Sequence, residues 1–573
     1  MKAAWIVKVL GALAIGLLWP NMTSWAADAD AGTLNQAVPE ISRPDWDMLQ
    51  ARPEIVEAWK DMRFGMFVCW GPVTLTGLEI GWSRGKARPG QTEGGRGPTP
   101  VEVYDNLYKT WMPEKFNARE WVKVAQDAGA RYIIFLVKHH DGFCLFDTKL
   151  TDYRITGPES AWKVDVFKDI ADACHEAGIK LIVYYSQPDW HHPDYRTANH
   201  ARYISYLHGQ VREILTNYGR IDGLWFDLGG KPEDWDSENL FKMARQLQPH
   251  LIINNRCGLP GDFDTPEQKL GRFQPERPWE TCMTLGTQWS WKPDDNIKSL
   301  KECVDALVTC AVRDGNLALN TNPMPDGQIE PRQVERFREL GQWLKQYGDS
   351  IYRTRGGPWK SAKWGGATRR DDTVYLHVLA WPAETLRLPP LPKKILASSL
   401  LTGGTVTVTQ SEDGVTVEVP PACRQELDTI IVLKIDGPAR EIEPIPIPSG
   451  ALTFGRKITA SSTWGPGYEP EMALDEDEGT RWGAAPDSRG GWLEVDLGNE
   501  TTFTRAVINE QGWNRIEAFE LQAWDGQAWQ TFAQGTRVGR LELTFDPVAA
   551  SKVRLNILKA NDVPTIWEFQ LYK

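Results

Sequence analysis

The sequence predicts a chain of mixed class, α/β plus all-β, in which a (β/α)8-like barrel is followed by a small β-sandwich and a C-terminal β-sandwich. Length is the first indication, because 573 residues are too many for one hydrophobic core, and three domains are expected. The second is a change of hydrophobic pattern, from strands that alternate with amphipathic helices to short alternating strands alone. The third is a Pro-rich stretch at 438–448, which is typical of a stiff linker.

The N-terminus, residues 1–26, has the pattern of a signal peptide. Lys2 and Lys8 precede an apolar stretch from Val9 to Trp19, and small residues flank Trp25 where a signal peptidase would cut. The apolar stretch is short for a membrane span, although a retained anchor is the alternative. We therefore expect an exported protein, periplasmic or extracellular, with no membrane span after processing.

Residues 46–350 are predicted to form the barrel, because short apolar strands alternate there with amphipathic helices. Seven strands are expected, at Phe64–Trp70, Tyr132–Val137, Leu181–Ser186, Gly223–Leu228, Leu251–Asn254, Thr281–Leu285 and Asn316–Asn320. Helices are expected at 118–129, 165–178, 197–216, 236–247, 297–312 and 331–347. The eighth strand of a complete barrel is expected to be short or missing.

Polar and aromatic side chains cluster just after these strands. They are Cys69-Trp70, His139-His140-Asp141, Tyr184-Tyr185-Ser186, Asp227, Asn255-Arg256 and Asn320. Barrel enzymes carry their chemistry at the C-terminal ends of the strands. A fold alone would not need this repeated polarity, so we expect an active site at this end of the barrel.

The remainder of the chain is predicted to be all β. Residues 357–436 show short strands of alternating polarity, at Thr373–Leu379, Thr405–Thr409, Val415–Val419 and Thr429–Leu433, which predict a small β-sandwich. Residues 450–573, beyond the Pro-rich linker, have the same character and are predicted to form a separate domain.

Composition points toward carbohydrate and away from nucleic acid. The chain has 64 Lys and Arg against 76 Asp and Glu, with a net charge of −12 and no long basic run, so no nucleic-acid partner is expected. The 27 Trp residues offer flat apolar faces that stack on sugar rings, although large β-rich proteins also use Trp in their cores. Eight Cys without a C-x-x-C pair disfavour a zinc site and a dense disulfide framework.

Asp227 ends a strand that is otherwise apolar, Gly223–Leu228. At the barrel mouth this carboxylate could attack an anomeric carbon as the nucleophile of a retaining glycosidase. An N-cap of the next helix is an equally good interpretation, because Asp is a favoured capping residue. A retaining mechanism also needs a second carboxyl as general acid, and Glu267, Glu276 and Glu280 are all candidates that spacing does not separate.

His139 and His140 follow the second strand, where they could donate hydrogen bonds to vicinal sugar hydroxyls. A metal is disfavoured, because adjacent residues at a strand end seldom point at one ion and no third ligand is suitably spaced. No cofactor or metal is therefore expected for catalysis.

Seven segments, in this order along the chain, resemble glycoside hydrolase family 29, the α-L-fucosidases. They are Arg63–Gly71, Lys138–Thr148, Tyr184–Ser186, Leu224–Asp227, Asn254–Arg256, Trp279–Thr284 and Gly315–Gly327. The resemblance covers roughly residues 46–436, including a β-sandwich after the barrel.

The resemblance implies roles for individual residues. Asp227 matches the nucleophile and Glu267 the acid/base, with Glu276 and Glu280 left open because that position varies across the family. The residues expected to line the sugar site are His139, His140, Tyr184, Trp225, Arg256, Trp82, Cys69 and Trp70.

Cys69 departs from the family pattern, which usually carries His before Trp-Gly and uses it to hold the axial 4-hydroxyl of fucose. A thiol is a weak donor and acceptor, so this contact should be lost or replaced. Three other substrates are therefore alternatives to a simple α-L-fucoside: an α-L-galactoside, an α-L-glucoside and a substituted fucose.

The last domain is similar to the discoidin, or coagulation factor 5/8 type C, fold, which carbohydrate-binding modules of family 32 share. The similarity rests on Ile458–Ser462, Glu471–Trp482, Trp492–Gly498 and Trp567–Leu571. That fold often holds a structural calcium, here implied near Asp475, Asp477, Thr480 and Glu568, whose oxygens suit Ca²⁺. A solvated acidic loop is the alternative.

Together these features predict an exported, retaining exo-glycosidase that hydrolyses terminal α-L-fucosides by double displacement, acting on fucosylated or related L-sugar glycans. The alternatives are a hydrolase of a related α-L-sugar and a catalytically silent sugar-binding protein on the same fold. A metal-dependent deacetylase or sulfatase fits poorly, because no ligand constellation is present. The oligomeric state does not follow from the sequence.

Overall fold

The computed structural model describes residues 48–86, 93–477 and 479–573. The predicted signal peptide at 1–26 lies outside this part of the chain, as does residue 478 in the predicted calcium loop. The described residues bury three separate hydrophobic clusters, one for the barrel and one for each of the two β-rich segments that follow it. No helix in these ranges is both long and apolar enough to cross a membrane.

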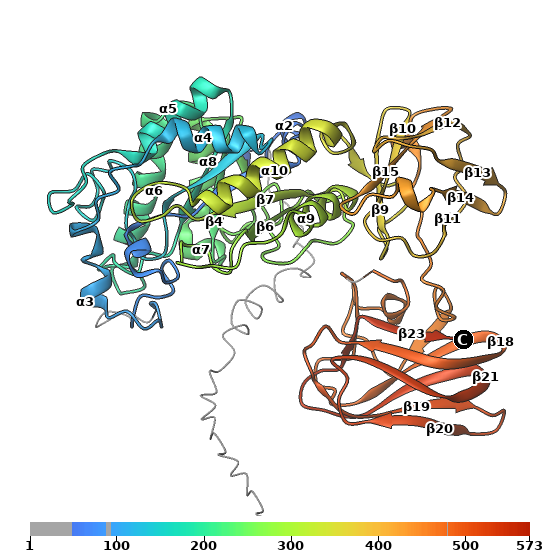
Figure 1. Cartoon of the computed structure of the whole chain (residues 1–573). Helices are drawn as coiled ribbons and strands as arrows, with labels where there is room; N and C mark the ends of the chain where they lie inside the picture. The colour runs from blue at the N-terminus through green and yellow to red at the C-terminus, as the bar shows by residue number, and fades with distance from the viewer. Residues whose placement is uncertain (1–47, 87–92, 478) are drawn as a thin grey trace, which may run out of the picture. The chain divides into compact units, whose positions relative to one another are not determined.

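A parallel sheet of seven strands forms the barrel (Figure 1). The strands are β1 (Phe64–Val68), β2 (Tyr132–Lys138), β3 (Lys180–Ser186), β4 (Gly223–Asp227), β5 (Ile252–Ile253), β6 (Glu280–Thr284) and β7 (Asn316–Thr321). Their order is β5-β4-β3-β2-β1-β7-β6, so the first strand pairs with both the second and the last. The sheet thus curls into a barrel that is open only between β5 and β6.

An irregular segment takes the place of the eighth strand. Parallel bridges join Phe263 to Asn254 after β5, and join Asp264 to Trp279 and Glu267 to Cys282 at β6. Backbone hydrogen bonds support them, including Glu280 N to Asp264 O at 2.8 Å. The short eighth strand expected from the sequence is therefore present only as isolated bridges, and this segment carries Glu267 to the mouth of the barrel.

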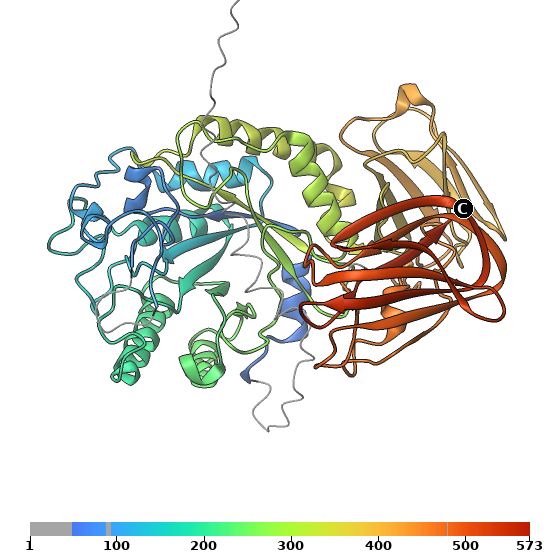
Figure 2. The same cartoon turned by 90° about the horizontal axis from the view of Figure 1, so that it is seen from below.

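Helices cover the outside of the barrel sheet (Figures 1 and 2). The longer ones are α2 (Pro53–Lys60), α4 (Ala118–Asp127), α5 (Val166–Ala177), α6 (His200–Asn217), α8 (Ser237–Leu247), α9 (Leu300–Val312) and α10 (Pro331–Tyr347). Side chains fix where they begin: Asn117 caps α4, and Ser299 and Glu302 form a capping box on α9. Short helices α3 (Val101–Tyr104) and α7 (Pro232–Trp235) lie in the connections.

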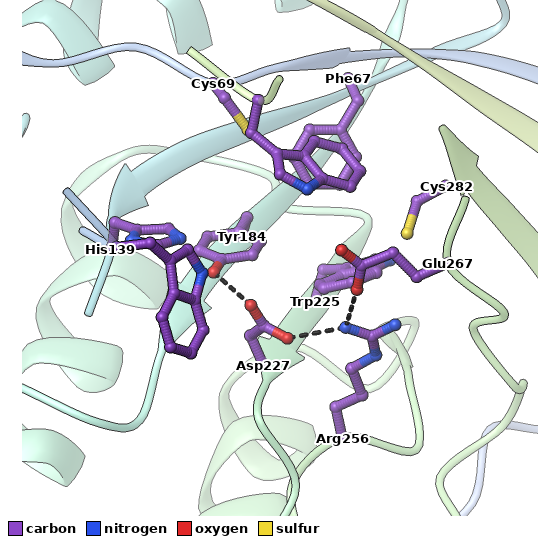
Figure 3. Close-up of a pocket in the computed structure, with 11 residues that line it drawn as sticks. Phe67, Cys69, His139, Tyr184, Trp225, Asp227, Arg256, Glu267 and Cys282 are labelled. Atoms are coloured by element: carbon purple, nitrogen blue, oxygen red, sulfur yellow. Dashed lines mark hydrogen bonds and ion pairs between the residues drawn. The ribbon is translucent and has the colours of Figure 1, made fainter. Parts of the chain in front are cut away.

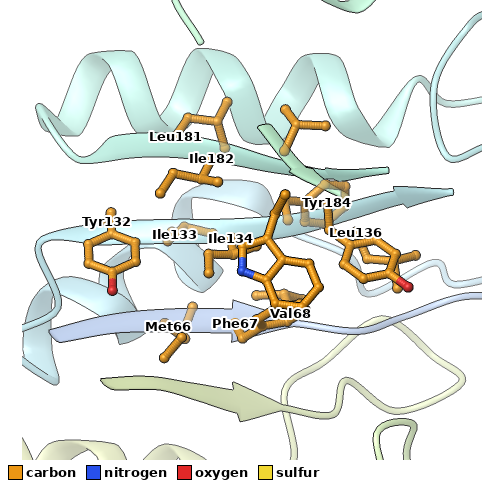
Figure 4. Close-up of a cluster of buried hydrophobic side chains, with 14 of the residues drawn as sticks. Met66, Phe67, Val68, Tyr132, Ile133, Ile134, Leu136, Leu181, Ile182 and Tyr184 are labelled. Carbon is orange, nitrogen blue, oxygen red and sulfur yellow. The ribbon is translucent and has the colours of Figure 1, made fainter. Parts of the chain in front are cut away.

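Both faces of the barrel strands are buried, which explains their continuous apolar sequences. Every residue of β1 and β2 is buried, and Figure 4 shows side chains of β1, β2 and β3 packed together. Gly65 on β1 has no side chain because a Cβ there would lie 2.2 Å from the ring of Tyr132. Because Gly65 has no side chain, the Tyr132 ring fits beside it. The Tyr132 hydroxyl then donates a hydrogen bond to Glu280 inside the barrel.

Two antiparallel β-rich segments follow. The first has one sheet of β12 (Ile395–Leu400), β15 (Thr429–Ile435), β10 (Thr373–Val378), β9 (Gly365–Arg370) and β8 (Arg355–Gly356), and one of β11 (Thr385–Leu388), β14 (Gly414–Glu418) and β13 (Thr407–Ser411). The second contains β16 (Lys457–Ala460), β18 (Gly491–Asn509), β21 (Arg540–Ala560), β19 (Ile516–Trp524), β20 (Trp529–Gly535) and β23 (Glu568–Tyr572), with β17 (Trp482–Gly483) and β22 (Thr565–Ile566) paired separately. The predicted fold class is confirmed, whereas the exact domain boundaries stay predictions.

A buried ionic cluster holds the start of β1 against the turn that precedes β7. The guanidinium of Arg63 lies 2.6 Å from Asp314 and also donates to the carbonyl of Gly315 at 3.0 Å. Lys60 lies 3.0 Å from the other oxygen of Asp314, and the backbone N–H of Gly356 donates to the first. Burial would raise the pKa of Asp314, but Arg63 and Lys60 outweigh it, and the pKa is lowered.

We predict that Asp314→Asn destabilises the protein by about 3–5 kcal/mol, because it leaves the fully buried guanidinium of Arg63 without its counter-charge. The free energy of unfolding from urea titration measures this. Asp326→Asn is the matched control, since its partner Lys115 is 62% exposed and the pair should contribute less than about 1 kcal/mol. Equal losses in the two variants would contradict the assignment.

Candidate active site

The candidate active site is a pocket at the C-terminal ends of the barrel strands (Figure 3). It is lined by Phe67, Cys69, Trp82, His139, Tyr184, Trp225, Asp227, Arg256, Glu267, Cys282 and Trp289. Eight of these residues were predicted from the sequence. The strands bring them together from segments that are far apart in the chain, as expected for a barrel enzyme.

Asp227 is fixed at the end of β4 by hydrogen bonds to both carboxylate oxygens. The hydroxyl of Tyr184 donates to Oδ2 at 2.6 Å, and Arg256 Nη1 donates to Oδ1 at 2.8 Å. Burial would raise the pKa of Asp227, but the charge of Arg256 and the hydrogen bond from Tyr184 outweigh it and hold the pKa well below its usual range. The alternative role as a helix N-cap is wrong, because the next helix, α7, is capped by Lys231.

Arg256 joins the two carboxylates that the sequence singled out. Its Nη1 atom donates to Asp227 Oδ1 and to Glu267 Oε2, at 2.8 Å in each case (Figure 3). These two oxygens therefore lie no further apart than twice that distance. The guanidinium is itself held by Thr265 and lies over the Trp225 ring, 4.9 Å from its centroid.

The three candidate acid residues lie in different environments. Glu267 lines the pocket, whereas Glu276 is exposed on a loop. Glu280 is fully buried inside the barrel, where it accepts hydrogen bonds from Tyr132 and from Trp225 Nε1. Burial raises the pKa of Glu280 to about 7 despite these two donors. Of the three, only Glu267 reaches the pocket and lies close to Asp227.

His140 is neutral, and its hydrogen bonds define its tautomer. The Ser186 hydroxyl donates to the carbonyl of Pro188 at 2.7 Å, so it must accept from His140 Nδ1, which lies 2.6 Å away. The other nitrogen, Nε2, then carries a lone pair and lies 3.4 Å from Asp227 Oδ2. Burial is the main cause that lowers the pKa of His140 to about 4. His140 was predicted to line the sugar site, but it is fully buried and is not among the residues that line the pocket.

His139 lines the pocket beside Tyr184, with the two rings stacked at 5.8 Å. Burial, together with the neighbouring His140, lowers its pKa well below the usual range. Gly81 lies against this ring: its φ is +64°, and a Cβ there would lie 2.3 Å from His139 Nδ1. The glycine thus permits the next residue, Trp82, to reach the rim of the pocket, where it is 45% exposed.

Aromatic rings form one wall of the pocket. Phe67 lies 5.5 Å from Trp225 and 5.7 Å from Trp289 between ring centroids, and Trp225 stacks on Tyr184. The thiols of Cys69 and Cys282 complete the lining. Burial raises the pKa of both thiols well above the usual value, so each is an uncharged, weakly polar group.

Trp70, predicted to line the sugar site, lies instead in the core. It is 1% exposed, donates its indole N–H to the carbonyl of Met324, and packs against Trp111, Phe116 and Trp121. Successive residues of an extended chain point to opposite sides, so Cys69 and its neighbour cannot both face the pocket.

Sequence reasoning missed Phe67, Trp289, Cys282 and a further acid, Glu79. The carboxylate of Glu79 accepts hydrogen bonds from the backbone N–H groups of Trp289 and Ser290. Burial raises its pKa to about 7, and the charge of Glu267 adds to the rise. An acid in an apolar loop directly after the first strand was the available signal for Glu79.

Two groups of residues bear on metal binding. In the described ranges, the ligand atoms of His139, His140 and Asp227 come within 4.8 Å of one another. Arg256, at 2.8 Å from Asp227, opposes a cation there, and the absence of a catalytic metal stays a prediction.

In the last domain, Asp475 accepts hydrogen bonds from Thr480 and from the backbone of Asp477, and Glu568 is buried on β23. Apart from residue 478, which is not described, the three carboxylates do not form a comparably close group. The calcium site likewise stays a prediction.

Comparison with known proteins identifies the family. The model of the family "Alpha-L-fucosidase" matches residues 32–349, and that of the "F5/8 type C domain" matches residues 457–569. Human plasma alpha-L-fucosidase is 28% identical over 418 residues, which cover 66% of this chain and 88% of that protein.

Solved structures agree with this result. Alpha-L-fucosidase isoenzyme 1 from Paenibacillus thiaminolyticus has a TM-score of 0.60 at 32% identity, covering 67% of this chain and 99% of its own. A GH29 alpha-L-fucosidase from Bacteroides thetaiotaomicron, solved as a trapped covalent intermediate, has a TM-score of 0.59 at 25% identity and covers 68% of this chain and 97% of its own. The chain therefore belongs to the α-L-fucosidase family of glycoside hydrolases, family 29, and carries a C-terminal F5/8 type C domain.

Proposed function

We propose that this protein is an exported, retaining exo-α-L-fucosidase that releases terminal L-fucose from glycans by double displacement. The observation that carries the proposal is the single Arg256 nitrogen that binds both Asp227 and Glu267. Two contacts of 2.8 Å to one nitrogen set an upper limit on the distance between the bound oxygens. That limit is compatible with the ~5–5.5 Å of retaining glycosidases and too short for the ~6.5–9.5 Å of inverting ones. The signal-peptide pattern of residues 1–26 supports export.

In the first step, Asp227 attacks the anomeric carbon and forms a glycosyl ester, while the bond to the leaving oxygen breaks and Glu267 donates its proton to that oxygen. In the second step, Glu267 takes a proton from water, which attacks the same carbon and releases the sugar and free Asp227. The low pKa of Asp227 supports this role, because it keeps the nucleophile ionised. The trapped covalent intermediate of the Bacteroides relative is consistent with such an ester.

Arg256 also provides a physical reason for the two roles of Glu267. Before attack, the guanidinium is shared by two carboxyl groups, and the charge on Asp227 disfavours a second charge on Glu267. Once Asp227 is esterified its charge is gone, and Arg256 then stabilises the ionised form of Glu267. The acid of the first step thereby becomes the base of the second.

We predict that Asp227→Gly lowers kcat on nitrophenyl α-L-fucoside by more than about 10³-fold, because the variant lacks the carboxylate that forms the ester. Azide, entering the vacated space, should restore part of the rate. Asp236→Gly is a control on a neighbouring segment, since its φ of +49° already suits glycine. Activity of the Asp227 variant within a few-fold of wild type would refute the nucleophile.

We predict that Glu267→Gln slows a natural fucosyl disaccharide by about 10²–10⁴-fold and slows nitrophenyl fucoside far less, because only a basic leaving oxygen needs a proton in the transition state. Kinetics on both substrates, with and without azide, measure this. Glu276→Gln should have little effect, and Glu280→Gln should lower both rates equally. If the dependence on leaving group appears in Glu280→Gln instead, that residue is the acid.

Cys69 favours a second candidate, a hydrolase whose selectivity at the sugar 4-position is relaxed. The family resemblance assigns this position to a histidine that holds the 4-hydroxyl, and a buried, protonated thiol is a weak partner for it. The 4-epimer of fucose, 6-deoxy-L-glucose, would then be tolerated. An α-L-galactoside differs from the fucoside at C6 and keeps the same 4-hydroxyl, so Cys69 does not bear on it.

We predict that Cys69→Ser raises the preference for nitrophenyl α-L-fucoside over the 6-deoxy-α-L-glucoside by about 2- to 10-fold, the value of one net hydrogen bond. The ratio of the two kcat/KM values measures this. Cys282→Ser, at the other thiol of the pocket, should leave the ratio unchanged. An unaltered ratio in Cys69→Ser would mean that residue 69 does not contact the 4-hydroxyl.

A further inference from the structure

The C-terminal domain has an outward sheet face that the proposed function does not use. Strands β16, β18, β21, β19 and β20 lie side by side, and the last four are labelled in Figure 1. Alternate residues of β18 and β21 are buried, so the residues between them point away from the core. One row of outward residues crosses all five strands in register: Thr459, Glu494, Arg554, Gln522 and Thr531.

Indole rings flank the centre of this row. The guanidinium of Arg554 lies 4.9 Å from the ring centroid of Trp492 and 4.1 Å from that of Trp529. The ring centroids of Trp524 and Trp529 lie 5.3 Å apart. All three tryptophans are partly exposed. The face therefore offers flat aromatic surface on both sides of a polar centre, which is the chemistry that recognises a sugar ring.

Two polar atoms at this centre are buried without a hydrogen-bond partner among the described residues: Arg554 Nε, a donor, and Gln522 Oε1, an acceptor. They belong to residues that face each other across β21 and β19. A buried polar group without a partner is costly, so such atoms in a native structure point to a bound water or ligand. A sugar hydroxyl is both a donor and an acceptor, so it is the kind of group that each of these two atoms lacks.

Charge on the face is balanced. Glu494 lies 3.1 Å from Arg554 and 3.5 Å from Lys552, and Glu520 accepts a hydrogen bond from Gln522. No excess of positive charge is left to attract a sulfate or carboxylate group. The balance favours an uncharged ligand.

We propose that this face, defined by Trp492, Trp529, Arg554 and Gln522, is a binding platform for a neutral glycan chain. Strands in a sheet lie about 4.8 Å apart, so the five-strand row extends over about 19 Å, enough for several sugar rings in line. The platform would hold a polymer on the enzyme without contacting the reacting bond. The proposal does not depend on the assignments at the active site.

Affinity gel electrophoresis of the full chain tests it, with fucosylated xyloglucan as the neutral polymer and sulfated fucoidan as the charged one. We expect xyloglucan to retard the wild-type protein, and Trp492→Ala/Trp529→Ala to weaken binding by about 10-fold or more, since aromatic stacking contributes about 0.5–1.5 kcal/mol per contact. Gln522→Ala, which removes the side-chain amide and leaves the indole rings in place, should weaken binding by about 2- to 10-fold. Turnover of nitrophenyl fucoside should be unchanged in both variants.

Tyr572→Ala is the matched control, because Arg505 lies over that ring at 4.0 Å in the same domain but away from the platform. It should bind xyloglucan like wild type, and thermal unfolding should show that all variants are folded. The proposal is overturned if xyloglucan does not retard the wild type, if only fucoidan does, or if both platform variants bind normally. It is also overturned if Trp513→Ala, in the separate cluster of Arg481, Trp513 and Trp567, abolishes binding while the platform variants do not.

Discussion

Arg256 places one positive charge between two carboxylates, and the geometry of the active site depends on that charge. Without it, the charges of Asp227 and Glu267 would repel each other, and burial would favour protonation of Asp227. The guanidinium is held by Thr265 and by the face of Trp225, so its position is set by the barrel and not by the substrate. A rigid charge of this kind is electrostatic preorganisation, because no reorientation is needed when charge moves during the reaction.

The irregular closure of the barrel explains how Glu267 comes to be there. A regular eighth strand would pair continuously with β5 and β6 and would direct its side chains alternately into the barrel and toward the helices. Isolated bridges at Phe263, Asp264 and Glu267 instead close the sheet and leave the chain free to turn toward the pocket. Functional side chains are often carried where the regular pattern breaks, and here the break lies beside the nucleophile.

Much of the fold followed from the sequence because the barrel strands are buried on both faces and their apolar character is continuous. The same argument identified Asp227, since an acid in such a strand needs a special environment. It could not separate Glu267 from Glu276 and Glu280, because spacing along the chain does not tell which of the three side chains reaches the pocket. The acids differ in their tertiary surroundings: Glu280 is inside the barrel, where Tyr132 and Trp225 donate hydrogen bonds to it.

Trp70 was assigned to the pocket by adjacency to Cys69, which ignores the alternation of side chains along an extended chain. Glu79 was missed because its burial depends on a loop that packs only in the folded state.

The contact between Gly81 and the ring of His139 limits how this enzyme could diverge. Any side chain at position 81 would both clash with that ring and strain a left-handed backbone, so the position is closed to change by single substitutions. Trp82, the next residue, is exposed and free of that constraint. New preferences for the leaving group should therefore arise at the rim, beginning with Trp82, while the sugar pocket behind it stays as it is. In laboratory evolution, libraries that randomise the rim should yield more active variants than libraries that include position 81.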